Sequence, residues 1–245
     1  MRLLLQIAIA LLLPFFLILS NVRIFMSSAY ARWEYAKPNF PSPEEVASWG
    51  NSGARSDDIT IVPIGFRQHI VDTTLDYVKG TGTESLIDED LLFDNGRRVY
   101  NEREVKHLTD VRILTGQAFL TQAIIGIVIL LSAVYLARTG RGSSAAKALL
   151  TGSIFTVGLI GFIGVFAAFA FRFYFVRFHR MFFEGETWMF PNTDTLIQIF
   201  PEKFWFDVSL LIVLFTLVSA VIIGVVSIVW IGMGRRANYQ PAYSQ

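Results

Sequence analysis

The 245-residue sequence combines 53% hydrophobic residues with only 17% charged residues, and its formal net charge is +1. This composition excludes an ordinary soluble domain, and the low net charge gives no indication of a nucleic-acid-binding surface. The chain contains no cysteine, which excludes disulfides, thiolate metal sites and a cysteine-based acyl-enzyme.

Four apolar segments are long enough to cross the hydrocarbon core of a bilayer, which is ~30 Å thick. Three of them carry no charge, namely Phe119–Ala137, Leu149–Phe171 and Val208–Ile231. A fourth apolar run begins at Leu3 and ends near Phe25. We therefore predict an all-α membrane protein that forms a single integral membrane domain over residues 1–245, with spans at about 3–25, 117–137, 148–171 and 207–232.

The first segment has a second interpretation. Arg2, the apolar run and Ala29-x-Ala31 together resemble a cleavable signal peptide. The apolar run is longer than the ~7–15 residues that are usual in a signal peptide. Arg23 lies near its end and can extend its guanidinium to the membrane interface. We therefore predict a retained helix and four spans in total.

The distribution of basic residues predicts the orientation. Three short segments contain no acidic residue, and in a chain with four spans all three lie on the same side of the membrane. Together they hold six basic residues: Arg2, Arg138, Arg141, Lys147, Arg235 and Arg236. The positive-inside rule makes this side cytoplasmic. Both termini are then cytoplasmic, while a cap at 26–116 and a second loop at 172–206 are extracytoplasmic.

The long outer segment is predicted to fold as a small cap of mixed secondary structure. The stretch "DDITIVPIGF" at 57–66 favours a strand, and "FRQHIVDTTLDYVKG" at 66–80 has the spacing of an amphipathic helix that ends at Gly80. Asn95-Gly96 is typical of a two-residue hairpin turn. In the second outer loop, the amphipathic segment 194–205 is interrupted by Pro201 and is expected to lie along the membrane surface.

The stretch "YNEREVKHLTDVRIL", residues 100–114, predicts a helix that precedes the second span. Asn101 is a favourable N-cap, and Glu104 lies three residues later in the capping-box position. His107 follows one turn later, with Asp110 on the same face and able to orient its imidazole. A Glu-x-x-His pair also occurs in di-iron bundles, but those contain two copies, so we predict no metal site.

The remaining histidines differ in their surroundings. His69 lies in the cap and is interpreted as a surface residue. His179 is flanked by Arg177 and Arg180, whose charges would lower the pKa of its imidazole and leave it neutral. It could simply belong to an interfacial aromatic belt. Because His107 and His179 both fall near the outer membrane surface, one site could contain both and perform acid–base chemistry on a lipid-borne group.

Two blocks of sequence resemble a known family. "YNEREVKHLTDVR" and "FHRMFFEGETWMFPNTDTLIQIFPEKFWFD", on a four-span chain, are similar to the Lit family, the bacterial lipoprotein intramolecular transacylases. The second block is the more distinctive of the two, whereas the cap between Arg32 and Phe93 shows no clear correspondence. The family's two essential histidines match His107 and His179.

This resemblance implies an enzyme of the bacterial cytoplasmic membrane that needs no cofactor. A fatty acyl group would move from the sn-2 ester of a lipoprotein's diacylglyceryl cysteine to the α-amino group of that cysteine. We expect His107, oriented by Asp110, to be the base and His179 to assist, although the two roles could be reversed. Candidate stabilisers of the oxyanion are Arg112, Arg177, Arg180 and Trp188, with Asp194 as a further supporting residue.

Two other classes of function fit the same architecture. A four-span protein with a cap could be a non-enzymatic binding, assembly or sensor protein, and this protein would leave lipoprotein N-termini unchanged. Two histidines could also ligate haem, which would give a Soret band. All three histidines lie outside the charge-free runs, however, and haem-ligating histidines usually lie within the spans.

Overall fold

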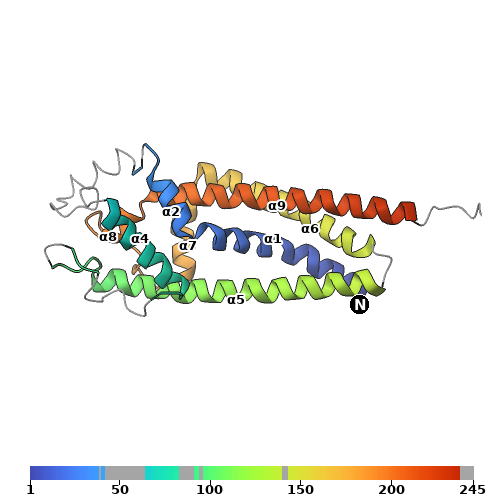
Figure 1. Ribbon diagram of the computed structural model, residues 1–245, viewed down its shortest axis with the longest axis horizontal. Coiled ribbons are helices and arrows are strands. Elements are labelled where there is room, and N and C mark those ends of the chain that lie inside the picture. The colour runs from blue at the N-terminus through green and yellow to red at the C-terminus, as the bar shows by residue number, and fades with distance from the viewer. Residues whose placement is uncertain (39, 42–63, 83–90, 94–95, 140–142, 238–245) are drawn as a thin grey trace, which may run out of the picture. The chain divides into compact units, whose positions relative to one another are not determined.

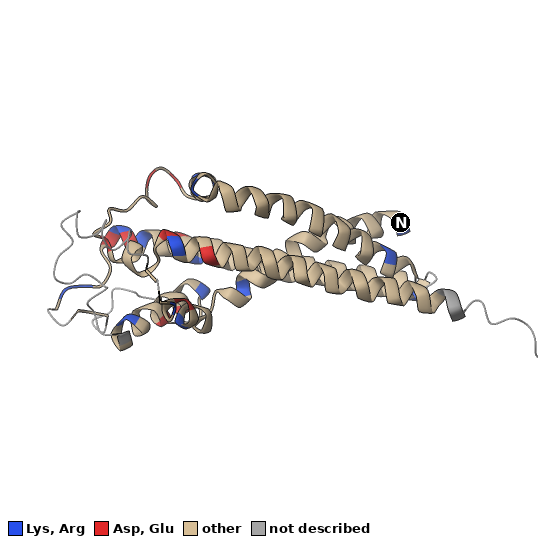
Figure 2. Cartoon of the chain, turned by 90° about the horizontal axis from the view of Figure 1, so that it is seen from above, with Lys and Arg blue, Asp and Glu red and all other residues tan. Residues whose placement is uncertain are grey.

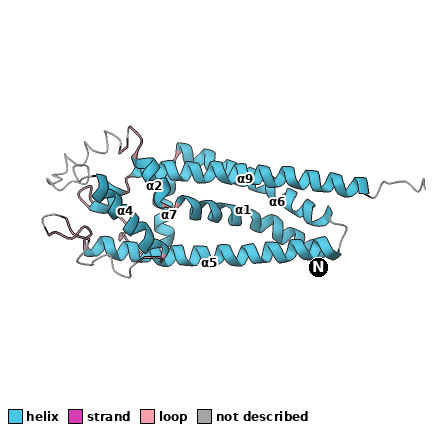
Figure 3. Cartoon of the chain, in the orientation of Figure 1, coloured by secondary structure: helices cyan, strands magenta, loops and turns pink. Residues whose placement is uncertain are grey.

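The computed structural model describes residues 1–38, 40–41, 64–82, 91–93, 96–139 and 143–237. Within these ranges the regular secondary structure is entirely α-helical, and no strand is present (Figures 1 and 3). The helices are α1 (Arg2–Phe25), α2 (Ser28–Tyr35), α4 (Ile64–Lys79), α5 (Glu102–Thr139), α6 (Ser143–Phe169), α7 (Phe171–Phe182), α8 (Thr195–Ile199) and α9 (Glu202–Ala237).

Four of these helices have the length and apolar composition of membrane spans. They cover Arg2–Phe25, Glu102–Thr139, Ser143–Phe169 and Glu202–Gly234. Long stretches of α5 and α9 carry no charged residue, as Figure 2 shows. In its described residues the protein is therefore an all-α, multi-pass membrane protein. The chain divides into two compact units.

The first unit contains α1, α6, residues 119–139 of α5 and α9 from Leu210 onward. Helix α1 contacts each of the other three helices. Its buried residues recur at helical spacing, so that a single face enters the interior: Ile9, Ala10, Leu13, Pro14, Leu17 and Asn21. Asn21 donates its side-chain N–H to Thr216 Oγ1 at 3.2 Å, which satisfies a buried amide within the apolar bundle.

Small residues permit close helix contacts in this unit. A Cβ atom added at Gly164 of α6 would lie 2.5 Å from Val213 Cγ1 of α9, and one added at Gly152 would lie 3.2 Å from Ala10 Cα of α1. Any larger residue at either position would force the helices apart. The small-residue contacts of membrane bundles take this form.

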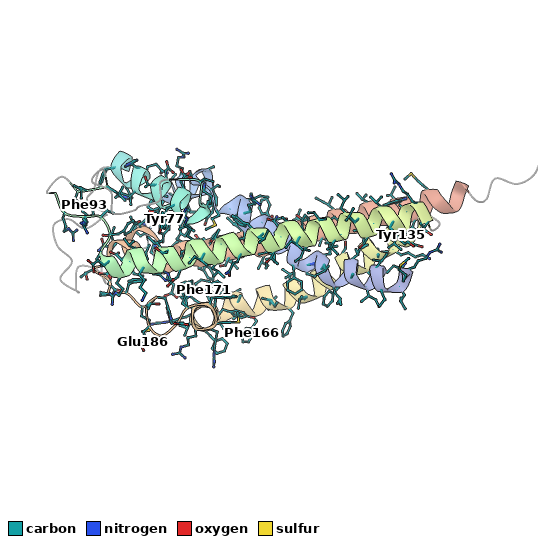
Figure 4. The ribbon with its side chains drawn as sticks, turned by 90° about the horizontal axis from the view of Figure 1, so that it is seen from below. Tyr77, Phe93, Tyr135, Phe166, Phe171 and Glu186 are labelled. Carbon is teal, nitrogen blue, oxygen red and sulfur yellow. The ribbon has the colours of Figure 1, made fainter. Side chains whose placement is uncertain are left out.

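The second unit contains α2, α4, α7 and α8, together with residues 102–118 of α5 and the first turns of α9. Helix α4 packs on α5 through Tyr77, whose hydroxyl lies 2.9 Å from Thr109 Oγ1 (Figure 4). Helix α4 ends at Lys79, and Gly80 follows with φ of 71°, the left-handed conformation of a glycine helix stop. The predicted amphipathic helix of the cap is confirmed.

The strand content expected of the cap is not found among the described residues. The predicted strand at 57–66 falls largely outside those residues, and its last three residues, 64–66, are the first turn of α4. At the predicted hairpin, Leu92 and Arg98 form an isolated antiparallel bridge, and Gly96 has φ of 77°. Asn95 itself lies outside the described residues.

A buried ionic network joins α2 to the start of α9. Glu34 is fully buried, accepts the Tyr30 hydroxyl at 2.7 Å and pairs with Lys37 Nζ at 2.8 Å. Lys37 also contacts Asp207 Oδ2 at 2.9 Å, and Lys203 binds the same oxygen at 2.8 Å. Every charge in this network therefore has an opposite charge beside it.

Replacing Lys37 with Met is expected to destabilise the protein by up to ~3–5 kcal/mol, because the Glu34 carboxylate would lose its buried counter-charge. The measurement compares the thermal unfolding of the purified parent protein and of the Lys37→Met variant in detergent. The double variant Glu34→Leu/Lys37→Met removes both charges and should recover much of the lost stability. A Lys37→Met variant as stable as the parent would contradict this structural role.

Candidate active site

The site begins with the capped N-terminus of α5. Asn101 Oδ1 accepts the backbone N–H groups of Arg103 and Glu104, each at 3.0 Å. Glu104 Oε2 in turn accepts the Asn101 N–H at 2.7 Å. The predicted capping box is confirmed. It fixes the first turn of the helix, and His107 projects from the next one.

Glu104 also holds the second outer loop. Its other oxygen, Oε1, accepts the backbone N–H of Leu196 in α8 at 2.7 Å, and the residue is only 1% exposed. Burial raises the pKa of this carboxyl to about 7, although both N–H groups oppose the shift. Nearby, Arg103 pairs with Asp194 at 2.9 Å. These two links fasten the loop onto α5 beside His107.

The structure brings His107 and His179 together. His107 comes from α5, ahead of the apolar run that starts at Phe119, and His179 comes from α7. Their ring centroids lie 6.2 Å apart and their planes are inclined by 24°, so the imidazoles are stacked. Histidines separated by 72 positions (179 − 107) in the sequence thus share one site.

Aromatic side chains enclose the histidine pair. The ring centroids of Phe183 and Phe190 lie 4.8 and 5.3 Å from that of His107. On the other side, Phe175 and Trp188 lie 4.1 and 4.9 Å from His179. His107 is consequently only 7% exposed. The enclosure thus buries His107 and leaves His179 half-buried.

Burial keeps both imidazoles neutral at pH 7. Burial, together with the smaller effect of the nearby His179, lowers the pKa of His107 to about 4. Burial also lowers the pKa of His179, against the opposing effect of a hydrogen bond to Phe175. The expectation that Arg177 and Arg180 cause the shift is wrong, because both are exposed and neither contributes to it. The direction of the shift agrees with the expectation, but its cause is desolvation.

The ring nitrogens of the two histidines have different partners. His179 Nδ1 lies 2.7 Å from the Phe175 carbonyl oxygen, so Nδ1 carries the proton and Nε2 carries the lone pair. His107 Nδ1 is buried without a hydrogen-bond partner among the described residues, and the same holds for the indole Nε1 of Trp188. Two polar atoms next to the stacked rings therefore have no protein partner, as is expected of atoms that bind a substrate.

The other predicted site residues lie elsewhere. Asp110 is half-buried and forms no hydrogen bond with His107 Nδ1. Arg112 stacks on Tyr77 of α4 with its guanidinium 4.9 Å from the ring centre, and Arg177 lies 5.2 Å from the ring centre of Phe173. These arginines and Arg180 are not among the residues that contact the imidazoles. His69 is exposed on α4.

Phe183, Phe190 and the second hydrogen bond of Glu104 were not foreseen from the sequence. The two phenylalanines lie in an aromatic-rich segment that an interfacial belt explains equally well. Their position just after His179, within one short loop, was the available signal. In the described part of the chain, no group of three or more His, Asp or Glu residues is arranged to hold a metal ion.

Comparison with known proteins places the chain among lipoprotein-modifying membrane proteins. The family model described as lipoprotein intramolecular transacylase Lit matches residues 7–205. A protein of Aquifex aeolicus (strain VF5), itself uncharacterized, is 26% identical over 91% of this chain and 93% of its own length.

Solved structures share the fold. The membrane integral lipoprotein intramolecular transacylase Lit from Bacillus cereus superposes with a TM-score of 0.70 at 19% identity, over 96% of this chain and 98% of that one. A variant of the same Bacillus cereus protein, with one histidine replaced by arginine, gives a TM-score of 0.68 at 17% identity, over 97% of this chain and 95% of that one.

Proposed function

The chain belongs to the lipoprotein intramolecular transacylase (Lit) family, and we propose that it moves an acyl group within one lipoprotein molecule. The donor is the sn-2 ester of the diacylglyceryl-modified N-terminal cysteine, and the acceptor is the α-amino group of the same cysteine. The amine nitrogen attacks the ester carbonyl carbon, the new C–N bond forms and the C–O bond to glycerol breaks. The released glyceryl oxygen takes up the proton lost by the amine, which gives a lyso-form lipoprotein.

The observation that carries this proposal is the stacked pair of a buried His107 and a half-buried His179, both with a lowered pKa. An α-ammonium group has a pKa near ~7.7–8.0, so it must lose a proton before it can attack at neutral pH. A neutral imidazole can accept that proton and later return it to the glyceryl oxygen, while the second proton that the nitrogen loses on becoming an amide is released to water. One residue can thus serve as base and acid within one reaction cycle.

His179 is the better base of the two. Its Nδ1–H is held by the Phe175 carbonyl, which fixes the tautomer with the lone pair on Nε2. The same hydrogen bond favours the imidazolium that forms when Nε2 takes the proton. His107 has no such support, and its pKa is lowered to about 4. The roles are therefore the reverse of those expected from sequence.

His107 and Trp188 are suited to stabilise the oxyanion. A His107 that stays neutral can carry its proton on Nδ1 and donate it as a hydrogen bond, as the indole Nε1–H of Trp188 also can. Donors aimed at the developing negative charge lower the barrier of acyl transfer. Arg112, Arg177 and Arg180, which do not contact the imidazoles, are not needed for this step.

The aromatic enclosure favours transfer to the amine over hydrolysis. Phe175, Phe183 and Phe190 cover the imidazoles, so water has little access to the activated ester. Amine and ester belong to the same molecule, and holding them close together supplies a large part of the rate enhancement. No covalent acyl-enzyme is required in this reaction.

We place the protein in the bacterial cytoplasmic membrane, with both termini inside and the histidine pair at the extracytoplasmic surface. The basic residues of the short segments support this orientation through the positive-inside rule. The proposed substrate is presented there, because lipoproteins are anchored in the outer leaflet by their diacylglyceryl groups.

Tandem mass spectrometry of lipoprotein N-termini, in a host that lacks the activity, tests the proposal. Acyl transfer leaves the total mass unchanged, so the position of the acyl chain must be measured. Mild alkali cleaves two ester-linked chains from the diacyl form and one from the lyso-form. Expression of this chain should change the number of alkali-labile chains from two to one, and an unchanged pattern would disprove the proposed function.

Replacing Trp188 with Phe should lower kcat by ~10²–10³-fold. Phenylalanine keeps an aromatic ring beside His179 but removes the only N–H donor of the side chain. The measurement is turnover of a purified diacylglyceryl lipopeptide in detergent. Trp205→Phe is the matched control, since its indole donates to the Phe200 carbonyl away from the histidines. Equal activity of the two variants would exclude an oxyanion role for Trp188.

The pH profile of kcat/KM reports the ionisation of the base. Because burial lowers the pKa of His179 below the ordinary value of 6.5, its neutral form persists into mildly acidic solution. We expect the acidic limb of kcat/KM to have its midpoint below pH 6.5. A midpoint of the acidic limb above 6.5 would contradict the assignment of a buried, neutral base.

A further inference from the structure

An open cavity of about 290 Å³ lies at the start of α5. Most of its lining residues are polar or charged, with both signs of charge, and they include Arg97, Arg98, Asn101, Glu102, Thr193 and Thr195. This volume is close to the lower end of the ~300–1,000 Å³ typical of small-ligand sites. None of these residues takes part in the acyl transfer described above.

The cavity shares a wall with the histidine site. Glu104 and Asp194 line the cavity, and Asp194 pairs with Arg103 at 2.9 Å. The Arg103 guanidinium lies 5.2 Å from the centre of the Phe190 ring, which covers His107. Glu104 precedes His107 by three residues of α5, a rise of ~4.5 Å along the helix axis. The cavity therefore adjoins the helical turn that precedes His107.

The extended segment that lines the cavity has a backbone edge available for pairing. Phe93 N donates to Arg97 O, and Val99 N donates to Leu91 O, so one side of this segment is paired. In this antiparallel pattern, the N–H and C=O of Arg98 point to the opposite side. Among the described residues they have no backbone partner. Such an edge can bind an extended peptide through main-chain hydrogen bonds.

We propose that this cavity, termed the peptide pocket, binds the first residues of the polypeptide that follow the lipidated cysteine of the substrate. The inference rests on the proposed function and deepens it. The two fatty acyl chains require apolar surroundings, whereas the peptide carries amide donors and acceptors that need polar partners. The exposed Arg98 edge, Thr193 and Glu102 supply such partners next to the reaction centre. The pocket thus recognises the protein part of a lipoprotein and distinguishes it from an ordinary membrane lipid.

The test compares two substrates with the full-length protein in detergent. One substrate is a diacylglyceryl-cysteine peptide with several residues after the cysteine, and the other is diacylglyceryl-cysteine amide, which lacks the peptide. Wild type should convert both, with at least a tenfold lower KM for the peptide substrate. Thr193→Trp fills the pocket from an exposed position and should raise KM for the peptide substrate about tenfold, while turnover of the amide stays unchanged.

Thr81→Trp is the control, because Thr81 is an exposed threonine of the same unit and does not line the pocket. It should behave as wild type on both substrates. Equal KM values of the wild type for the two substrates would overturn the peptide pocket. A Thr193→Trp variant whose KM values for the two substrates match those of the wild type would overturn it as well. Failure of wild type to convert either substrate would instead refute the proposed function, so the two failures are distinguishable.

Discussion

Replacing His179 with alanine is expected to lower the production of lyso-form lipoprotein by ~10²–10⁴-fold, the usual contribution of a positioned general base. The variant loses the imidazole whose tautomer is fixed by the Phe175 carbonyl. His179→Gln should be equally inactive, because the amide nitrogen takes the place of Nε2 but cannot accept a proton. The measurement is the initial rate of conversion of a purified diacylglyceryl lipopeptide.

The control for this substitution is His69→Ala, which removes an exposed histidine from α4. It should leave the rate unchanged. His179 lies within an amphipathic helix that has no fully buried residue, so its loss should disturb folding little. A His179→Ala variant that retains more than a tenth of the wild-type rate would show that another group removes the proton from the amine.

Replacing His107 with alanine is expected to reduce kcat by ~10²–10³-fold, as does the loss of an oxyanion donor. The variant removes the buried Nδ1 that has no hydrogen-bond partner within the described parts of the chain. His107→Asn tests the role more sharply, since its side-chain amide places an N–H donor near the position of Nδ1. We expect His107→Asn to be at least tenfold more active than His107→Ala.

The contrast between the two conservative variants separates the two roles. A donor can be replaced by an amide, whereas a base cannot. If His179→Gln retains activity and His107→Asn does not, His107 is the base and the assignment must be reversed. The same kinetic assay, applied to both variants under identical conditions, decides the question.

Much of the helical framework was predictable because its signals are local. Asn101 and Glu104 form a capping box that depends only on residues three positions apart. Gly80 ends α4 because the left-handed conformation favours glycine. Pro201 separates α8 from α9, as its position in the amphipathic segment indicated. Three charge-free runs and the apolar run from Leu3 likewise indicated the four apolar helices.

The chemistry of the site was harder to predict from the sequence, because it depends on contacts between distant segments. The spacing of three residues predicted that Asp110 lies on the same helix face as His107 and orients its imidazole. The imidazole instead contacts Phe183 and Phe190 from the second loop. Adjacent arginines in the sequence suggested a charge effect on His179, yet helical geometry directs Arg177 and Arg180 into exposed positions. For His107, burial by residues remote in sequence, which no local pattern reveals, lowers the pKa.

Glu104 illustrates how one residue can have a local and a long-range role. Its capping hydrogen bond was predictable, whereas its hydrogen bond to Leu196 required the fold. The carboxylate therefore stabilises the start of α5 and also holds the second loop beside His107. This loop supplies Phe190 and Trp188, which contact the two histidines.

The intramolecular nature of the transfer is the central claim, and a crossover measurement tests it most directly. Two diacylglyceryl lipopeptides of different sequence, one with deuterated acyl chains and one with unlabelled chains, are mixed with the purified protein. Tandem mass spectrometry then identifies the chain on each α-amine. Each peptide should carry only the acyl isotope with which it started. Exchange of labelled chains between the two peptides would contradict the mechanism.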